Sequence, residues 1–159
     1  MSKIQIRNGL FETNSSSTHC IVIANNEVYN YSEVNFTLGQ FGWEHKIYTD
    51  THTKAQYLYT AIIQLEDKES LEALKKNLDF VHVKYTFEEP KEKEGEFYYI
   101  DHGSNLKYWV PFVCHNLGLL LNYLFSKESF VETGNDGMSD DEFTTKRPER
   151  VLLEYFKKN

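Results

Sequence analysis

Cysteine is scarce in this chain, which carries only two cysteines in 159 residues. Cys20 and Cys114 lie far apart in the sequence, so they do not form a pair with metal-ligand spacing, and a disulfide framework would need more of them. Both lie in apolar runs, where free cysteine is usually buried. We therefore expect two reduced, buried thiols in a cytoplasmic protein.

Long apolar runs are also lacking. No stretch approaches the roughly 20 consecutive apolar residues that cross a bilayer as a helix. The first residues alternate between polar and apolar side chains, which is not typical of the apolar core of a secretory signal peptide. A membrane is therefore not expected as a partner.

The common catalytic and nucleotide-binding motifs are missing as well. The chain has no Walker loop, no G-x-G-x-x-G, no H-E-x-x-H, no C-x-x-C and no G-x-S-x-G sequence. Its six histidines show no ligand spacing. We expect no metal and no cofactor, and the sequence assigns no catalytic residue, so whether the chain is an enzyme stays open.

Positive charge is in deficit, since 17 Lys and Arg face 24 Asp and Glu, for a formal net charge of −7. Binding to nucleic acid needs clustered Lys and Arg to neutralise phosphates. Direct nucleic-acid binding is therefore not expected. An acidic chain suits instead a protein partner with a basic surface.

Strands and helices are predicted in blocks along the chain, not in strict alternation. This order favours an α+β fold, with a largely antiparallel sheet and three to four helices in a single domain over residues 1–159. The run 19–24 is apolar on both faces and predicts a central strand. Further strands are expected over 3–7, 27–31, 81–87, 96–100 and 129–132, with a hairpin joining 81–87 to 96–100 and an aromatic loop at 36–43.

Helices are predicted from apolar side chains at helical spacing over 53–65, 68–77, 111–126 and 148–157. Asp50 or Thr51 is expected to cap the first of them. Pro111 is expected to open the third, since proline suits the first turn of a helix.

The segment before the central strand carries the densest group of small polar side chains. Hydroxyl groups and free backbone N–H groups can surround a phosphate or a carboxylate, and an imidazole can supply a proton or a charge. The alternative is that these side chains bond their own backbone in an ordinary turn. The candidate ligand-binding residues are Asn14, Ser15, Ser16, Ser17 and His19.

Three other places offer candidates for the same pocket. Asp101 and His102 follow a predicted strand, Asn135 and Asp136 lie among glycines that free the backbone, and Glu44 follows the aromatic loop. The alternative for each of these places is an ordinary turn or a surface group with no ligand. The alternative for the aromatic residues of the loop is that they belong to the core.

The run Phe11-Glu12-Thr13-Asn14-Ser15-Ser16-Ser17-Thr18-His19, followed by an apolar strand, resembles the opening of many small proteins from bacteriophages and prophages. The stretches 41–44 (F-G-W-E), 101–104 (D-H-G-S) and 130–136 (F-V-E-T-G-N-D) resemble the same group, in the same order. The resemblance implies a phage or mobile-element gene whose product acts in the cytoplasm of an infected or lysogenic bacterium. It carries over no catalytic residue.

Two functions from different classes follow. The first is an accessory inhibitor that blocks a host protein, such as a nucleic-acid-binding defence enzyme, through acidic side chains. The second is a small enzyme or ligand-binding protein that holds a nucleotide or another phosphorylated metabolite in the polar pocket. The acidic candidates for the first function are Glu132, Asp136, Asp140, Asp141 and Glu142.

Overall fold

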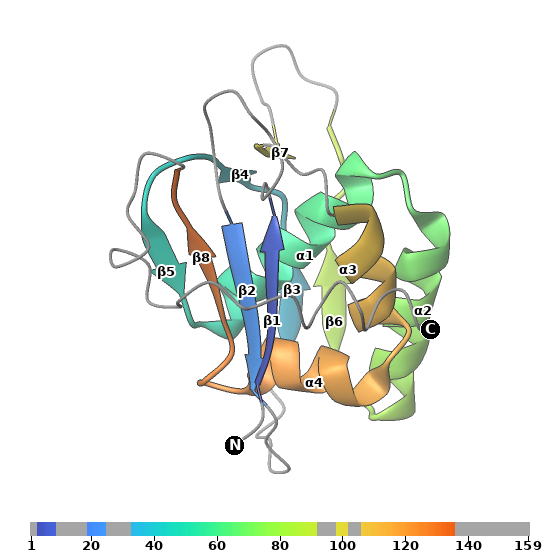
Figure 1. Ribbon diagram of the computed structural model, residues 1–159. Helices are drawn as coiled ribbons and strands as arrows, with labels where there is room; N and C mark the ends of the chain where they lie inside the picture. Colours follow the sequence, from blue (N-terminus) through green and yellow to red (C-terminus); the bar gives the residue numbers. More distant parts are fainter. Residues whose placement is uncertain (1–2, 9–18, 25–32, 92–97, 102–105, 136–159) are drawn as a thin grey trace.

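A computed structural model describes residues 3–8, 19–24, 33–91, 98–101 and 106–135 (Figure 1). These residues form a mixed α+β fold, as the sequence predicts. The described helices are α1 (Thr51–Gln64), α2 (Lys68–Phe80), α3 (Leu106–Cys114) and α4 (Leu117–Phe125). The strands are β1 (Lys3–Asn8), β2 (His19–Ala24), β3 (Val34–Phe36), β4 (Gln40–Phe41), β5 (Lys46–Tyr48), β6 (Tyr85–Phe87), β7 (Tyr99–Ile100) and β8 (Phe130–Thr133).

The main sheet has the strand order β1-β2-β8-β5, and each neighbouring pair is antiparallel. β2 lies inside this sheet, and all six of its residues are buried. This confirms the central strand expected from a run that is apolar on both faces. In Figure 1, β5 forms the outer edge of the sheet, and α2 lies on the opposite side of the molecule.

The first two helices begin where aspartate caps them. The Asp50 carboxylate accepts from the Thr53 N–H at 2.7 Å, and the Asp67 carboxylate accepts from the Ser70 N–H at 2.9 Å. Each bond satisfies one of the N–H groups that a helix start leaves without an intrahelical acceptor. α1 therefore begins at Thr51, two residues before the predicted start at residue 53. α2 extends to Phe80, beyond the predicted end at residue 77.

The predicted single helix over 111–126 is wrong. Pro111 lies inside α3, which begins at Leu106 and ends at Cys114, and a separate helix starts at Leu117. The break is stabilised by Asn116, whose side-chain oxygen accepts from the Leu119 N–H at 3.0 Å. An asparagine cap inside an apolar run was the sequence signal for two helices.

The predicted hairpin is also wrong. β6 pairs in parallel with β3, and β7 pairs in parallel with β4, so the two strands belong to different small sheets. The expected aromatic loop at 36–43 thus contains the end of β3 and all of β4. The strand predicted over 81–87 forms only over 85–87, because Val81 caps the end of α2 and His82 has a positive φ of 57°. The predicted exposure pattern still holds in part, since Val83 is buried while His82 and Lys84 are exposed.

Several other predicted elements lie outside the described residues. They are the strand at 27–31 and the helix at 148–157, together with residues 96–97 of the strand predicted at 96–100. None of the described helices combines the length and the apolar character needed to cross a bilayer.

The core contains a buried cation. Lys54 of α1 is fully buried, and its Nζ donates to the carbonyl oxygens of Ser126 at 2.7 Å and of Ser129 at 3.0 Å. Burial lowers the pKa of Lys54 from 10.5 to about 8, partly opposed by the nearby charge of Asp50. A neutral amine has two N–H groups, which matches the two carbonyl oxygens, whereas the ammonium form leaves a third donor over.

We expect the protein to become more stable between pH 7 and pH 9, by about 1 kcal/mol, because of Lys54. Its folded pKa lies below the unfolded value, so the unfolded chain binds more protons in this window and stability rises with pH. The test is urea denaturation across this range, with Lys54→Met as the comparison. Cys114 near pH 9, and Tyr59 and Tyr123 at higher pH, act in the opposite direction, because burial raises their pKa values. A Lys54→Met variant that kept the rise would contradict this assignment.

Candidate functional site

His19, the first residue of β2, has no exposed surface. Its Nε2 lies 2.8 Å from the Gly42 carbonyl oxygen, and its Nδ1 lies 2.9 Å from the Tyr57 hydroxyl oxygen. A carbonyl can only accept, so Nε2 carries the hydrogen, and in the neutral ring Nδ1 accepts from the Tyr57 hydroxyl. His19 therefore connects the loop after β4 to helix α1.

The backbone carbonyl groups of the loop after β4 accept hydrogen bonds from several other parts of the fold. We call residues Phe41–His45 the clamped loop. Its carbonyl oxygens at positions 41–44 each accept a hydrogen bond from elsewhere in the fold. The donors, in order from residue 41 to residue 44, are the Asp101 N–H at 2.9 Å, His19 Nε2 at 2.8 Å, Asn135 Nδ2 at 3.2 Å and Thr133 Oγ1 at 2.6 Å.

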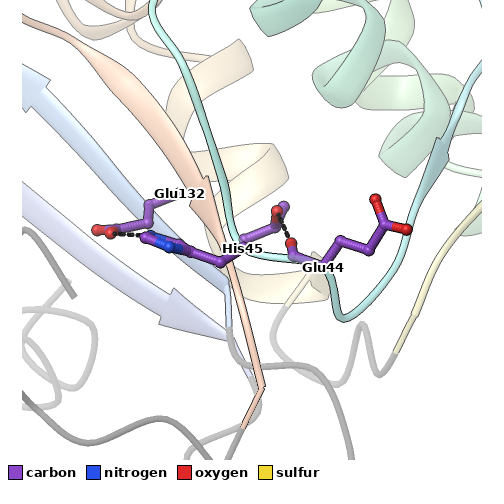
Figure 2. Close-up of polar contacts among 4 residues, drawn as sticks. Glu44, His45 and Glu132 are labelled. Atoms are coloured by element: carbon purple, nitrogen blue, oxygen red, sulfur yellow. Dashed lines mark hydrogen bonds and ion pairs between the residues drawn. The ribbon is translucent and has the colours of Figure 1, made fainter. Parts of the chain in front are cut away.

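The loop ends at a histidine paired with a buried carboxylate. His45 Nε2 lies 3.0 Å from Glu132 Oε1, and Figure 2 shows this contact beside the Glu44 carbonyl that Thr133 bonds. The His45 side chain is 40% exposed, whereas the Glu132 side chain is completely buried. Glu132 is therefore not a surface charge, contrary to the sequence-based assignment to an acidic surface.

The side chains of the clamped loop divide between core and solvent. Phe41 is buried and packs edge-on against Tyr57, with ring centroids 4.8 Å apart. Trp43 is 64% exposed. Of the three aromatic residues in the loop predicted at 36–43, Phe36 and Phe41 thus belong to the core and Trp43 lies at the surface.

Glu44 also faces solvent, and its carboxylate lies 2.9 Å from Lys46 Nζ. The hydrogen bond and charge of Lys46 lower the pKa of Glu44, and the hydrogen bond to Glu44 raises the pKa of Lys46. Both side chains are more than half exposed, so water screens the pair and its contribution to stability is small.

Four of the ten pocket candidates lie in the described residues, and the clamped loop brings them together. His19 and Asn135 bond the loop through side chains, Asp101 bonds it through its backbone N–H, and Glu44 belongs to it. The other pocket candidates are Asn14, Ser15, Ser16, Ser17, His102 and Asp136, which lie outside the described residues, as do the acidic candidates Asp140, Asp141 and Glu142.

Sequence reasoning missed three residues that matter here: His45, Tyr57 and Thr133. His45 follows Glu44 directly, and Thr133 follows Glu132 just after the strand predicted over 129–132, so both were adjacent to residues already chosen. Tyr57 gave no signal, because an aromatic residue on an apolar helix is usually plain core. Only the tertiary structure brings its hydroxyl group within 2.9 Å of His19 Nδ1, at the start of β2.

Within the described part of the chain, no three His, Cys, Asp or Glu side chains are grouped so that they could hold a metal ion. The arrangement uses its polar side chains to fix a backbone loop and to hold one tryptophan in solvent. A scan against protein-family models, a search of curated proteins and a search of solved structures found no match to this chain.

Proposed function

We propose that this protein is a binding module that presents Trp43 to a protein partner. The observation that carries the proposal is that four consecutive carbonyl groups of the clamped loop are bonded by other parts of the fold while Trp43 stays 64% exposed. A catalytic reading of His19 has less support, because both of its ring nitrogens are engaged and it is fully buried.

The physical reason is preorganisation. Binding through a mobile loop loses free energy when the loop becomes ordered, whereas a loop already fixed by hydrogen bonds avoids much of that cost. Tryptophan is among the residues that contribute most to protein interfaces, because it buries a large apolar area with few rotatable bonds. An exposed tryptophan on a fixed loop is therefore suited to act as an interface anchor.

The partner we propose is a host protein with a basic surface, blocked by a phage- or mobile-element-encoded inhibitor in the bacterial cytoplasm. Two features support it: the net charge of −7 and the resemblance of four sequence stretches to small phage proteins. A nucleic-acid-binding defence enzyme is one such host protein, since its groove must be basic to hold phosphates. The acidic candidates at 140–142 would add to association by charge steering.

The experiment is capture of the host partner with the wild-type chain, followed by affinity measurements on the purified partner with Trp43→Ala. We expect the substitution to weaken binding by at least tenfold, because truncation of a central interface tryptophan commonly costs 2 kcal/mol or more. The free energy of unfolding should change by less than about 0.5 kcal/mol, since the side chain is mostly in solvent.

The matched control is Tyr108→Ala on α3, which removes another exposed aromatic side chain, 54% exposed, from a different part of the fold. Binding should be unaffected by this change. If both variants lost the same affinity for the partner, or if Trp43→Ala kept full affinity, the clamped loop would not be part of the binding surface.

One observation favours the second candidate, a ligand-binding protein or small enzyme for a nucleotide or other phosphorylated metabolite. A buried carboxylate behind a half-exposed imidazole, as in Glu132 and His45, fixes the orientation of the ring. The same binding experiment includes His45→Gln. This candidate would be favoured if both His45→Gln and Trp43→Ala still bound the host partner while His45→Gln no longer bound phosphate.

A further inference from the structure

The small sheet of β3 and β6 has an open edge along β6. β6 pairs in parallel with β3 and with no other described strand (Figure 1). The hydrogen bonds of this pair continue past both ends of β6. The Lys84 C=O accepts from the Val34 N–H at 2.9 Å, and the Glu88 N–H donates to the backbone C=O of residue 36 at 2.8 Å. Residues 84–88 therefore form one extended segment alongside β3.

The direction of the backbone groups along this segment follows from those two bonds. Lys84 and Glu88 point their backbone groups to β3, and strand residues alternate in the side to which these groups point. Thr86 therefore also points to β3, whereas the N–H and C=O groups of Tyr85 and Phe87 point to the open edge. No described residue bonds these four outward groups. An unpaired edge of this kind is a template for another strand.

Helix α2 contacts β6 through side chains and not through this edge. The Tyr85 hydroxyl donates to the Asp79 carboxylate at 2.9 Å, and Lys75 Nζ lies 5.7 Å from the centroid of the Phe87 ring. Tyr85 and Phe87 are half-buried by such contacts. Their outward backbone groups take part in none of them.

The segment along the edge is complementary to itself. Residues 84–88 read Lys-Tyr-Thr-Phe-Glu. When a second copy runs antiparallel to the first with Thr86 at the centre, Tyr85 lies opposite Phe87 of the second copy. Lys84 then lies opposite Glu88 of the second copy. Aromatic pairs and opposite-charge pairs both stabilise neighbouring strands.

The two charged side chains are available for this contact. Lys84 and Glu88 are both exposed. One carboxylate oxygen of Glu88 accepts from the Leu38 N–H at 2.8 Å, which leaves the other oxygen for Lys84 of the second copy. A carboxylate has two oxygens and can accept from both donors at once.

This register is the one two-fold register that pairs every outward backbone group. Hydrogen-bonded positions of an antiparallel pair must both point outward, and Tyr85 opposite Phe87 meets this condition twice. Centring on Tyr85 would bring Val83 to such a position, but its N–H already donates to the Leu78 C=O at 3.0 Å. Centring on Phe87 puts Tyr85 opposite Glu89, so the aromatic pair is lost.

We propose that two copies of this chain associate through their β6 edges, with Tyr85 of each copy beside Phe87 of the other. Lys84 of each copy pairs with Glu88 of the other. The contact joins two small sheets into one with the order β3-β6-β6-β3 and satisfies the outward groups of both copies. Sheets of more than two strands are also the more stable ones. The proposal goes beyond the proposed function, which uses the clamped loop of a single copy.

The test is sedimentation of the purified full chain over a range of concentrations. We expect the average mass to approach twice that of the chain as concentration rises. Lys84→Glu and Glu88→Lys should each weaken the dimer about tenfold or more, since each replaces two opposite-charge contacts by like-charge contacts. An equimolar mixture of the two variants should form a heterodimer as tight as the wild-type dimer, because both contacts then join opposite charges again.

The matched control for the charge changes is Lys127→Glu, which reverses another exposed lysine in the turn between α4 and β8. It should leave the mass unchanged. Urea denaturation checks that each variant keeps its fold, which we expect because the substituted side chains are exposed.

A second pair of variants tests the backbone contact without any change of charge. Tyr85→Pro removes an outward N–H and should weaken the dimer at least tenfold, while an edge strand tolerates proline on its open side. Tyr85→Phe keeps the N–H and the ring and loses only the hydroxyl group that bonds Asp79. It should dimerise like wild type.

Three results would each overturn the dimer. They are a chain that is monomeric at every concentration, a mixture of folded charge variants that forms no heterodimer, and a Tyr85→Pro variant that dimerises like wild type. A monomer whose Trp43→Ala variant loses the host partner would leave the proposed function intact. A dimer with no loss of partner in Trp43→Ala would do the reverse.

Discussion

Replacing Trp109 by alanine is expected to lower the free energy of unfolding by about 4 kcal/mol, which is a large part of the stability of a domain of this size. Trp109 of α3 is completely buried. Its ring lies near Tyr57 and Tyr123, with centroid distances of 5.9 Å and 6.0 Å. Alanine would leave a large cavity between three elements that these rings join, and such cavities collapse only in part.

A second variant separates the size of Trp109 from its polar group. The indole Nε1 is buried without an acceptor among the described residues. Trp109→Phe keeps an aromatic ring and removes this unsatisfied donor, so we expect it to cost only about 1–2 kcal/mol. Both variants are measured by urea denaturation. A phenylalanine that costs as much as alanine would contradict the expectation that a smaller aromatic ring keeps most of the packing around Trp109.

Replacing His19 by leucine is expected to cost about 3 kcal/mol. The ring bonds the Tyr57 hydroxyl and the Gly42 carbonyl, and leucine leaves both without this partner inside the fold. A buried polar group that loses its partner loses its solvation without compensation, at about 1–3 kcal/mol for each group. The effect should reach function too, because the Gly42 bond is one of four that fix the loop of Trp43.

Tyr57→Phe is the matched control for His19→Leu. It removes the hydroxyl group that His19 bonds and keeps the bond to Gly42, so we expect a loss of about 1 kcal/mol and no change in partner binding. Denaturation and partner affinity are measured for both variants. If His19→Leu cost no more than Tyr57→Phe, the bond from His19 to the loop would contribute nothing to stability.

The parts of the fold that sequence alone predicts are those whose cause is local. A run that is apolar on both faces cannot lie at a surface, so the central position of 19–24 followed directly from its side chains. Asp50 was recognisable as a cap because a short acidic side chain before an apolar helical pattern bonds N–H groups within its own first turn. These relations need no knowledge of distant residues.

The errors arose where distant segments compete. Two strands close in sequence, 81–87 and 96–100, were expected to pair with each other, but each instead pairs in parallel with an earlier strand. Sequence patterns show which face of a strand is apolar and say little about its neighbour. The error over 111–126 had a different cause, because the cap at Asn116 is a local signal that the apolar periodicity around it concealed.

The sequence by itself determined the α+β class, the buried central strand and the acidic charge, because composition and periodicity carry these properties. Only the tertiary structure decided what the polar residues do. His19, Thr133 and Asn135 bond the backbone of one loop because the register of β2 and β8 brings them there. The same register buries Glu132, which composition alone placed on the surface. A hydrogen bond depends on positions within a few tenths of an ångström, and only the packing of segments far apart in the chain sets those positions.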